Sequence, residues 1–262
     1  GSDLYMSGTT FFTLGLGDVT PTSTAARFFT VLESGVGLGF LALVISYLPV
    51  LFQAFSRRET SVSLLDARAG SPPSATEMLV RGGHGEREDQ LTTLLREWEQ
   101  WSAELLESHL SFPILAYFRS QHDNQSWVAA LAAVLDTCAL VLAGLDGVGA
   151  QRQARLTFAI ARHASVDLAQ ILNVPKPKRI SERLPHEEFV RLRDRLSREG
   201  FSFCKSEATI AKFAKLRALY EPNLHGLSQH LLMDLPPWVP REGAQDDWES
   251  EPGDLATVMP LP

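Results

Sequence analysis

The longest apolar run of the sequence lies near the start of the chain, over residues 28–55. Its only charged residue is Glu33, and Arg57 and Arg58 follow it closely. As a helix it would be roughly 42 Å long at about 1.5 Å per residue, whereas a bilayer core is about 30 Å thick. A buried helix of a soluble core rarely runs this long without charge, and a signal peptide is shorter. The pattern predicts a transmembrane helix whose carboxyl end enters the cytoplasm.

Small and helix-breaking residues interrupt this apolar run. Gly35, Gly37 and Gly39 alternate over about one turn. Pro49 follows, and it removes one backbone hydrogen bond from the helix. These residues favour either a helix that bends or a helix that packs closely against a neighbour. Glu33 is costly in an apolar medium, so we expect it to face protein or water, or to snorkel to the interface.

Beyond the run, the pattern predicts a linker, a helical domain and a tail. Residues 59–87 are rich in Ser, Gly, Pro and charge, which is typical of a linker. Helical periodicity returns over residues 88–233 with few strand signals, and this region is long enough to bury its own core. Within it, residues 126–145 are apolar apart from Asp136. They form either a second membrane span or, as we favour, a buried helix of the bundle. The predicted fold class is therefore all-α.

Composition narrows the function classes. The net charge is −7, and residues 241–262 hold six acids against one arginine, so residues 234–262 are predicted to be an acidic, disordered tail. No basic stripe with interleaved aromatics appears, and nucleic acid is not an expected partner. Cys138 and Cys204 lack CxxC spacing and are expected to be reduced, buried thiols. The histidines lack metal-ligand spacing and no catalytic constellation is visible, so we expect neither an enzyme nor a metal or cofactor site.

A glycine-rich stretch directly precedes the apolar run. Its sequence, TTFFTLGLGD over residues 9–18, places Gly15 and Gly17 on alternate positions after Thr13. Glycine adopts backbone dihedrals that residues with a Cβ atom resist, and such a strand can point successive carbonyl groups at one axis. The stretch resembles the TxxTxGxGD pore-loop signature of the potassium channel superfamily, in the prokaryotic form with a two-transmembrane-helix pore module.

The resemblance implies a role for each residue of the signature. The selectivity filter would consist of Thr13, Leu14, Gly15, Leu16 and Gly17, with Asp18 at its outer mouth. Leu16 stands where the family usually has an aromatic residue that braces the filter. Gly37 lies twenty residues after Gly17, which is the place of the family's hinge in the inner helix. Gly39 and Pro49 are further candidate hinge positions.

The resemblance also implies an assembly and a missing segment. One pore loop per chain means that four chains complete one filter, so we expect a homotetramer in the lipid bilayer. Potassium would be the permeant ion at the filter carbonyls, with no other metal. The family's outer helix and most of its pore helix precede the signature. We therefore expect the reading frame upstream of Gly1 to encode them, and the sequence to be truncated at its amino end.

Two functions remain open at this point. The first is a subunit of a cation channel, potassium-selective and gated by bending of the inner helix under the influence of a cytoplasmic helical domain. It would be an integral protein of the cell membrane. The second is a non-conducting, membrane-anchored interaction or sensor protein whose working part is the helical domain. The ligand or partner of that domain cannot be read from the sequence.

Overall fold

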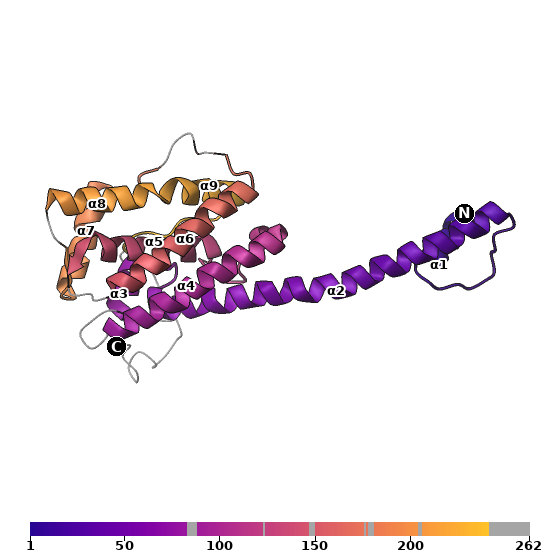
Figure 1. The fold of residues 1–262 in the computed structure, drawn as a ribbon, viewed down its shortest axis with the longest axis horizontal. Helices are drawn as coiled ribbons and strands as arrows, with labels where there is room; N and C mark the ends of the chain where they lie inside the picture. Colours follow the sequence, from indigo (N-terminus) through magenta and orange to yellow (C-terminus); the bar gives the residue numbers. More distant parts are fainter. Residues whose placement is uncertain are drawn as a thin grey trace. The chain divides into compact units, whose positions relative to one another are not determined.

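The computed structural model describes residues 1–82, 88–122, 124–146, 150–175, 177, 181–203 and 206–240. Over these residues the chain is mostly helical, which confirms the all-α prediction (Figure 1). Contacts divide the chain into a first unit, Gly1–Ala54, and a second unit, Phe55–Pro262.

The first unit contains a short helix, α1 (Ser2–Phe11), and most of a long one, α2 (Thr24–Ala69). The Ser23 hydroxyl accepts a hydrogen bond from the Ala26 backbone N–H (3.1 Å) and so caps the start of α2. α2 remains one helix through Pro49. Large apolar side chains along it are open to the surroundings, among them Phe28 (66% exposed) and Ile45 (72%). Such a surface is typical of a helix that faces lipid.

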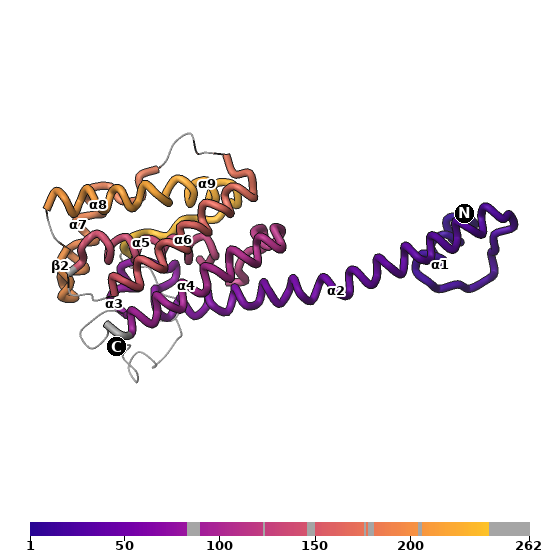
Figure 2. Tube along the Cα trace, in the orientation of Figure 1, coloured from indigo at the N-terminus to yellow at the C-terminus, as the bar shows by residue number. Residues whose placement is uncertain are grey.

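The second unit is a bundle built around α5. Its helices are α3 (Ala75–Gly82), α4 (Glu88–Ser111), η2 (Pro113–Tyr117), α5 (Trp127–Gly144), α6 (Gln151–Ile171), α7 (His186–Arg198), α8 (Glu207–Ala218) and α9 (Glu221–Leu231). β1 (Leu145–Asp146) pairs antiparallel with β2 (Ser202–Phe203). α5 packs against α3, α6 and α8, and α4 lies along α6 (Figure 2). The core of this unit therefore surrounds α5.

Two helices of the described residues, α2 and α5, are long and apolar enough to cross a membrane. They differ in what surrounds them. Only 11% of the most apolar window of α2 is buried in the protein, against 89% for α5. In α5 every residue except Leu142 and Gly144 is buried. Residues 126–145 thus form the buried helix of the bundle that the sequence favoured over a second span.

The predicted linker is wrong for most of its length. α2 continues to Ala69, and α3 follows after a turn at residues 70–74. The core takes in apolar side chains from this stretch: Val62, Leu65, Ala69, Ala75, Met78 and Leu79. The Ser, Gly and Pro signal came mainly from the short turn and from residues 83–87, which lie outside the described residues. Because of this signal, the apolar positions at helical spacing before and after the turn were not recognised as helices.

The predicted tail is also partly wrong. Residues 234–240 pack against the second unit, and Trp238 is fully buried there. Its ring lies 5.6 Å from the guanidinium carbon of Arg183 and 5.4 Å from that of Arg217, and its backbone carbonyl accepts a hydrogen bond from the Thr76 hydroxyl. The buried Trp238 ring and these polar contacts together hold the proline-rich segment. Residues 241–262, the acidic part of the tail, lie outside the described residues.

Candidate functional site

The chain folds back tightly over the carboxyl end of α1. The backbone N–H groups of Leu14 and Gly15 both donate to the carbonyl of Thr9, at 2.7 and 3.2 Å. In a planar trans peptide the N–H points opposite to the carbonyl of the preceding residue. The carbonyls of Thr13 and Leu14 therefore both point away from α1. This irregular segment, residues 13–17, is called the filter strand below although it belongs to no sheet, and it lies over the end of a helix whose partial negative charge attracts a cation.

Backbone dihedrals alternate along the same strand. Thr13, Gly15 and Gly17 have positive φ values of 58°, 55° and 76°, whereas Leu14 and Leu16 between them do not. In an ordinary β-strand successive carbonyls point to opposite sides. A change in the sign of φ at every second residue rotates alternate peptide planes, and the carbonyls then gather on one side. Thr13 is a β-branched residue in the left-handed region, a strained conformation of the kind found at functional sites.

Asp18, at the end of this strand, is tied back to α1. One carboxylate oxygen accepts the backbone N–H of Val19 (3.1 Å), and the other accepts the Tyr5 hydroxyl (2.8 Å). The aromatic ring that the family usually has at the Leu16 position is replaced here by a leucine that is 65% exposed. Sequence reasoning missed Tyr5. An aromatic hydroxyl thirteen residues before the acid, in the first turns of a helix, was the available signal.

Glu33 joins α2 to α1. Its carboxylate accepts a hydrogen bond from the Ser7 hydroxyl, so the acid within the apolar run faces protein. Ser7 was not singled out by the sequence, because serine is common and its partner lies 26 residues further along the chain.

Of the three alternating glycines, Gly37 meets a neighbour within the chain. A Cβ atom built on Gly37 would lie 1.9 Å from the carbonyl oxygen of Phe11, far inside van der Waals contact. A Cβ on Gly35 or Gly39 would have no atom within 4 Å. The bare backbone at Gly37 therefore allows α2 to touch the last residue of α1, which is the close-packing interpretation. The hinge role of Gly37, Gly39 and Pro49 stays a prediction.

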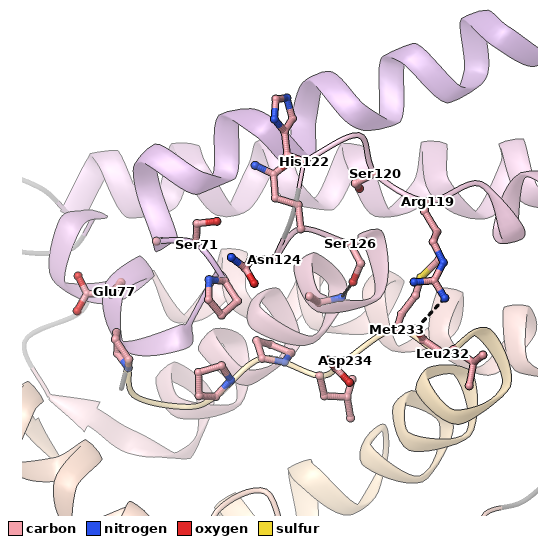
Figure 3. A pocket seen from close by; sticks show the side chains of 18 of the residues that line it. Ser71, Glu77, Arg119, Ser120, His122, Asn124, Ser126, Leu232, Met233 and Asp234 are labelled. Carbon is pink, nitrogen blue, oxygen red and sulfur yellow. Dashed lines mark hydrogen bonds between the residues drawn. The ribbon is translucent and has the colours of Figure 1, made fainter. Parts of the chain in front are cut away.

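The second unit contains a cavity of about 1020 Å³ (Figure 3). Its wall is formed by the loop after η2, by the start of α3 and by the segment that follows α9. The labelled side chains include Ser120, Asn124 and Ser126 from the loop, with Glu77 and Asp234 from the other two walls. The segments that form its walls lie far apart in the sequence, and each is a loop or the end of a helix. No local sequence pattern therefore predicted the cavity.

Two features make this cavity polar. Arg119 donates to the carbonyl of Leu232 (3.0 Å), which ties the loop to the end of α9. The buried Ser120 hydroxyl and the side-chain amide oxygen (Oε1) of Gln125 have no hydrogen-bond partner among the described residues. Buried polar atoms normally find partners, so the cavity has capacity for water or a polar ligand.

The acid of α5 is part of a buried ion network. Asp136 accepts hydrogen bonds from Arg183 (2.6 Å) and from the Tyr220 hydroxyl (2.6 Å), and Arg183 also donates to the carbonyl of Pro236 (3.0 Å). Burial alone would lower the pKa of Arg183, but the Asp136 carboxylate raises it, so the guanidinium stays charged. Burial and the same carboxylate raise the pKa of Tyr220 well above its usual value. Asp136, the acid of this apolar helix, thus connects α5 to the segment after α9 through Arg183.

Comparison with known proteins supports an ion channel module in the first unit. A family model described as "Ion channel" matches residues 1–54. Among curated proteins, the chain is similar to the uncharacterized membrane protein YdjJ of Bacillus subtilis (strain 168), at 28% identity over 134 residues. This match covers 51% of the chain but only 38% of the relative's length. No solved structure matches the chain. The two matches support an ion channel module in residues 1–54 and a location in a membrane.

Proposed function

We propose that this chain is a subunit of a potassium-selective channel and that residues Thr13–Gly17 form its filter. The observation that carries the proposal is the strand itself. Its alternating φ values and its two N–H bonds to Thr9 turn successive carbonyls to the side away from α1. Carbonyl oxygens arranged in this way replace the water shell of a permeant cation. Asp18 adds a carboxylate where the strand ends.

The same geometry supports a homotetramer. One strand supplies one column of oxygens, and a dehydrated cation needs oxygens on all sides, so four chains would surround one axis. Arg57 and Arg58 follow the apolar part of α2 and favour the cytoplasmic side for the second unit. Potassium would be the permeant ion at the filter carbonyls.

Gating would act through α2. Its last turns belong to the core of the second unit, where Val62 and Leu65 are buried, while its apolar part begins before Gly37. A rearrangement of the second unit would therefore move the carboxyl end of the same helix. Gly39 and Pro49 are the positions at which this helix would bend most easily.

Flux through vesicles tests this function. The full-length natural protein is reconstituted in potassium-loaded vesicles, and rubidium uptake is compared with sodium uptake. We expect rubidium flux that is lost in Gly15→Asp, because a side chain strains the left-handed residue and a carboxylate intrudes on the ion path. The matched control is Gly35→Ala, where a Cβ atom meets no neighbour within the chain. Absence of flux, or flux that Gly15→Asp leaves unchanged, would contradict the proposal.

The cavity of the second unit favours one alternative function. A non-conducting, membrane-anchored sensor would bind its ligand there, and the first unit would serve only as an anchor. Such a protein would show no flux under any condition, and the second unit expressed without residues 1–54 would retain its full ligand response. A channel would instead need both units for a response that is measured as flux.

A further inference from the structure

Four large apolar side chains are exposed within nine residues at the end of α4 and in η2. They are Leu110 (45% exposed), Ile114 (52%), Tyr117 (55%) and Phe118 (39%), and they are called the η2 patch below. Ile114 and Tyr117 are three residues apart in a 3₁₀ turn, so their side chains lie on a shared face, and Leu110 precedes them in the last turn of α4. A grouped apolar face of this kind marks contact with another surface.

The backbone beneath the η2 patch is satisfied from inside the protein. The buried Arg58 guanidinium donates to the carbonyls of Leu115 (2.9 Å) and Phe118 (2.6 Å). The Trp127 indole donates to the carbonyl of Ala116 (3.2 Å). Carbonyls that are already bonded cost nothing further when water leaves, so these three lower the cost of moving the segment toward an apolar medium.

The η2 patch lies beside the residues at which the apolar run of α2 ends. Phe55 is the last residue of that run, and its ring lies 5.8 Å from the ring of Phe118. The Arg58 guanidinium that holds η2 also lies over the Phe55 ring, at 5.3 Å. At about 1.5 Å per residue, Arg58 is only about 4–5 Å beyond Phe55 along the helix. The first charge after the run, Arg57, is exposed.

We propose that the η2 patch is a lipid-binding surface, inserted at the boundary between headgroups and acyl chains of the bilayer that α2 crosses. Leu110 and Ile114 would contact acyl chains, and Tyr117 has the amphipathic ring that is favoured at this depth. Arg57 and Arg119 are exposed residues that adjoin Arg58 and Phe118 in the sequence, and their charges would fit anionic lipid phosphates. The inference rests on the membrane position of α2 in the proposed function, but not on ion conduction.

Depth measurement with spin labels tests the proposal. The full chain, with Cys204→Ser so that only the introduced thiol reacts, is labelled at Ile114→Cys and reconstituted in vesicles that contain phosphatidylglycerol. Cys138 is fully buried, and burial raises the pKa of its thiol, so it does not compete for the label. Collisions with oxygen, which concentrates in lipid, are compared with collisions with a water-soluble nickel chelate. Ile45→Cys in α2 is the lipid control, and Ile210→Cys in α8 (44% exposed) is the aqueous control.

We expect the oxygen-to-nickel accessibility ratio at position 114 to be severalfold higher than at position 210 and close to that at position 45. A ratio at 114 equal to that at 210 overturns the proposal. Shielding of 114 from both reagents also overturns it and indicates contact with another protein chain. A water-like ratio at 45 would instead refute the membrane position of α2 itself, so failure of the inference and of the proposed function are distinguished. Because residue 114 is more than half exposed, the substitution leaves the core intact.

Discussion

At the scale of single residues, two glycines of this chain are needed for different physical reasons. Gly15 has a φ of 55°, a backbone conformation that a side chain resists. Gly37 lies in an ordinary helix, and what it provides is space, since a Cβ atom would lie 1.9 Å from the Phe11 carbonyl oxygen. The spacing between signature and hinge glycine drew attention to Gly37, but the nature of its role could be seen only with α1 in place.

We predict that Gly37→Ala displaces α2 from the end of α1. Overpacking of a close contact costs typically about 1–3 kcal/mol, and here the opposing atom is backbone, which cannot rotate away. The thermal midpoint of the detergent-solubilised protein should fall, and rubidium flux should fall with it. Gly39→Ala is the matched control, because no atom lies within 4 Å of its Cβ position in the chain. Equal stability of the two variants would show that α1 and α2 do not meet at Gly37.

At the scale of elements, α2 is where sequence and structure differ most. The apolar run predicted its membrane part, since an uncharged run of this length is rare outside membrane helices. Its extension to Ala69 was missed, because the composition of the turn at residues 70–74 was assigned to the whole stretch. Val62 and Leu65 are three residues apart on one face, a helical signal that was present but short. The role of Arg58 in holding η2 depends on contacts more than fifty residues away and could not be read locally.

The contact between α2 and α4 predicts a pH dependence of stability. His109 is buried; its Nδ1 donates to the carbonyl of Leu105 (2.7 Å), and its Nε2 faces the Arg58 guanidinium at 3.4 Å. Burial, and then the charge of Arg58, lower the pKa of His109 to about 4. The folded state therefore binds fewer protons than the unfolded state between about pH 4 and 6.5. The contribution of the neutral His109 to the free energy of unfolding is fully present above pH 6.5. It is lost as the pH drops to about 4, by an amount on the order of 3 kcal/mol.

Thermal unfolding of the detergent-solubilised chain between pH 7 and pH 4 measures this slope. In His109→Asn the side chain stays neutral at every pH, so the slope should decrease, whatever the stability of the variant at pH 7. His186→Asn is the control, because that histidine is exposed at the start of α7 and its loss should leave the slope unchanged. A slope that His109→Asn does not reduce would contradict a buried, neutral histidine.

At the scale of the whole molecule, the second unit is held together by groups that sequence distance separates. Asp136 stood out as the acid of an apolar segment, and that segment was correctly favoured as a buried helix. Its partners, Arg183 and Tyr220, lie 47 and 84 residues further along the chain, and no spacing rule connects them. The cavity next to Asp234 has the same origin, since its walls meet only after folding. Helical periodicity reveals elements, whereas the ion network and the cavity are products of their packing.

The buried network gives the last prediction, Asp136→Asn. The substitution keeps the shape of the side chain but leaves the buried Arg183 guanidinium only the more distant Glu221 carboxylate, 3.7 Å away. Removing one partner of a buried ion pair typically costs about 3–5 kcal/mol, and the Glu221 contact places the expected cost toward the lower end of that range. Glu97→Gln is the matched control: it removes the same charge from the pair with Arg68, whose side chains are 48% and 54% exposed. Exposed pairs contribute at most about 1 kcal/mol, so the thermal midpoint should drop far more in Asp136→Asn than in Glu97→Gln.

Because Arg183 also donates to the Pro236 carbonyl, the segment after α9 should loosen in Asp136→Asn, and hydrogen exchange at residues 234–240 should accelerate. Unchanged exchange there, with a lowered midpoint, would show that the contacts made by Trp238, and not the Arg183 bond, hold the segment.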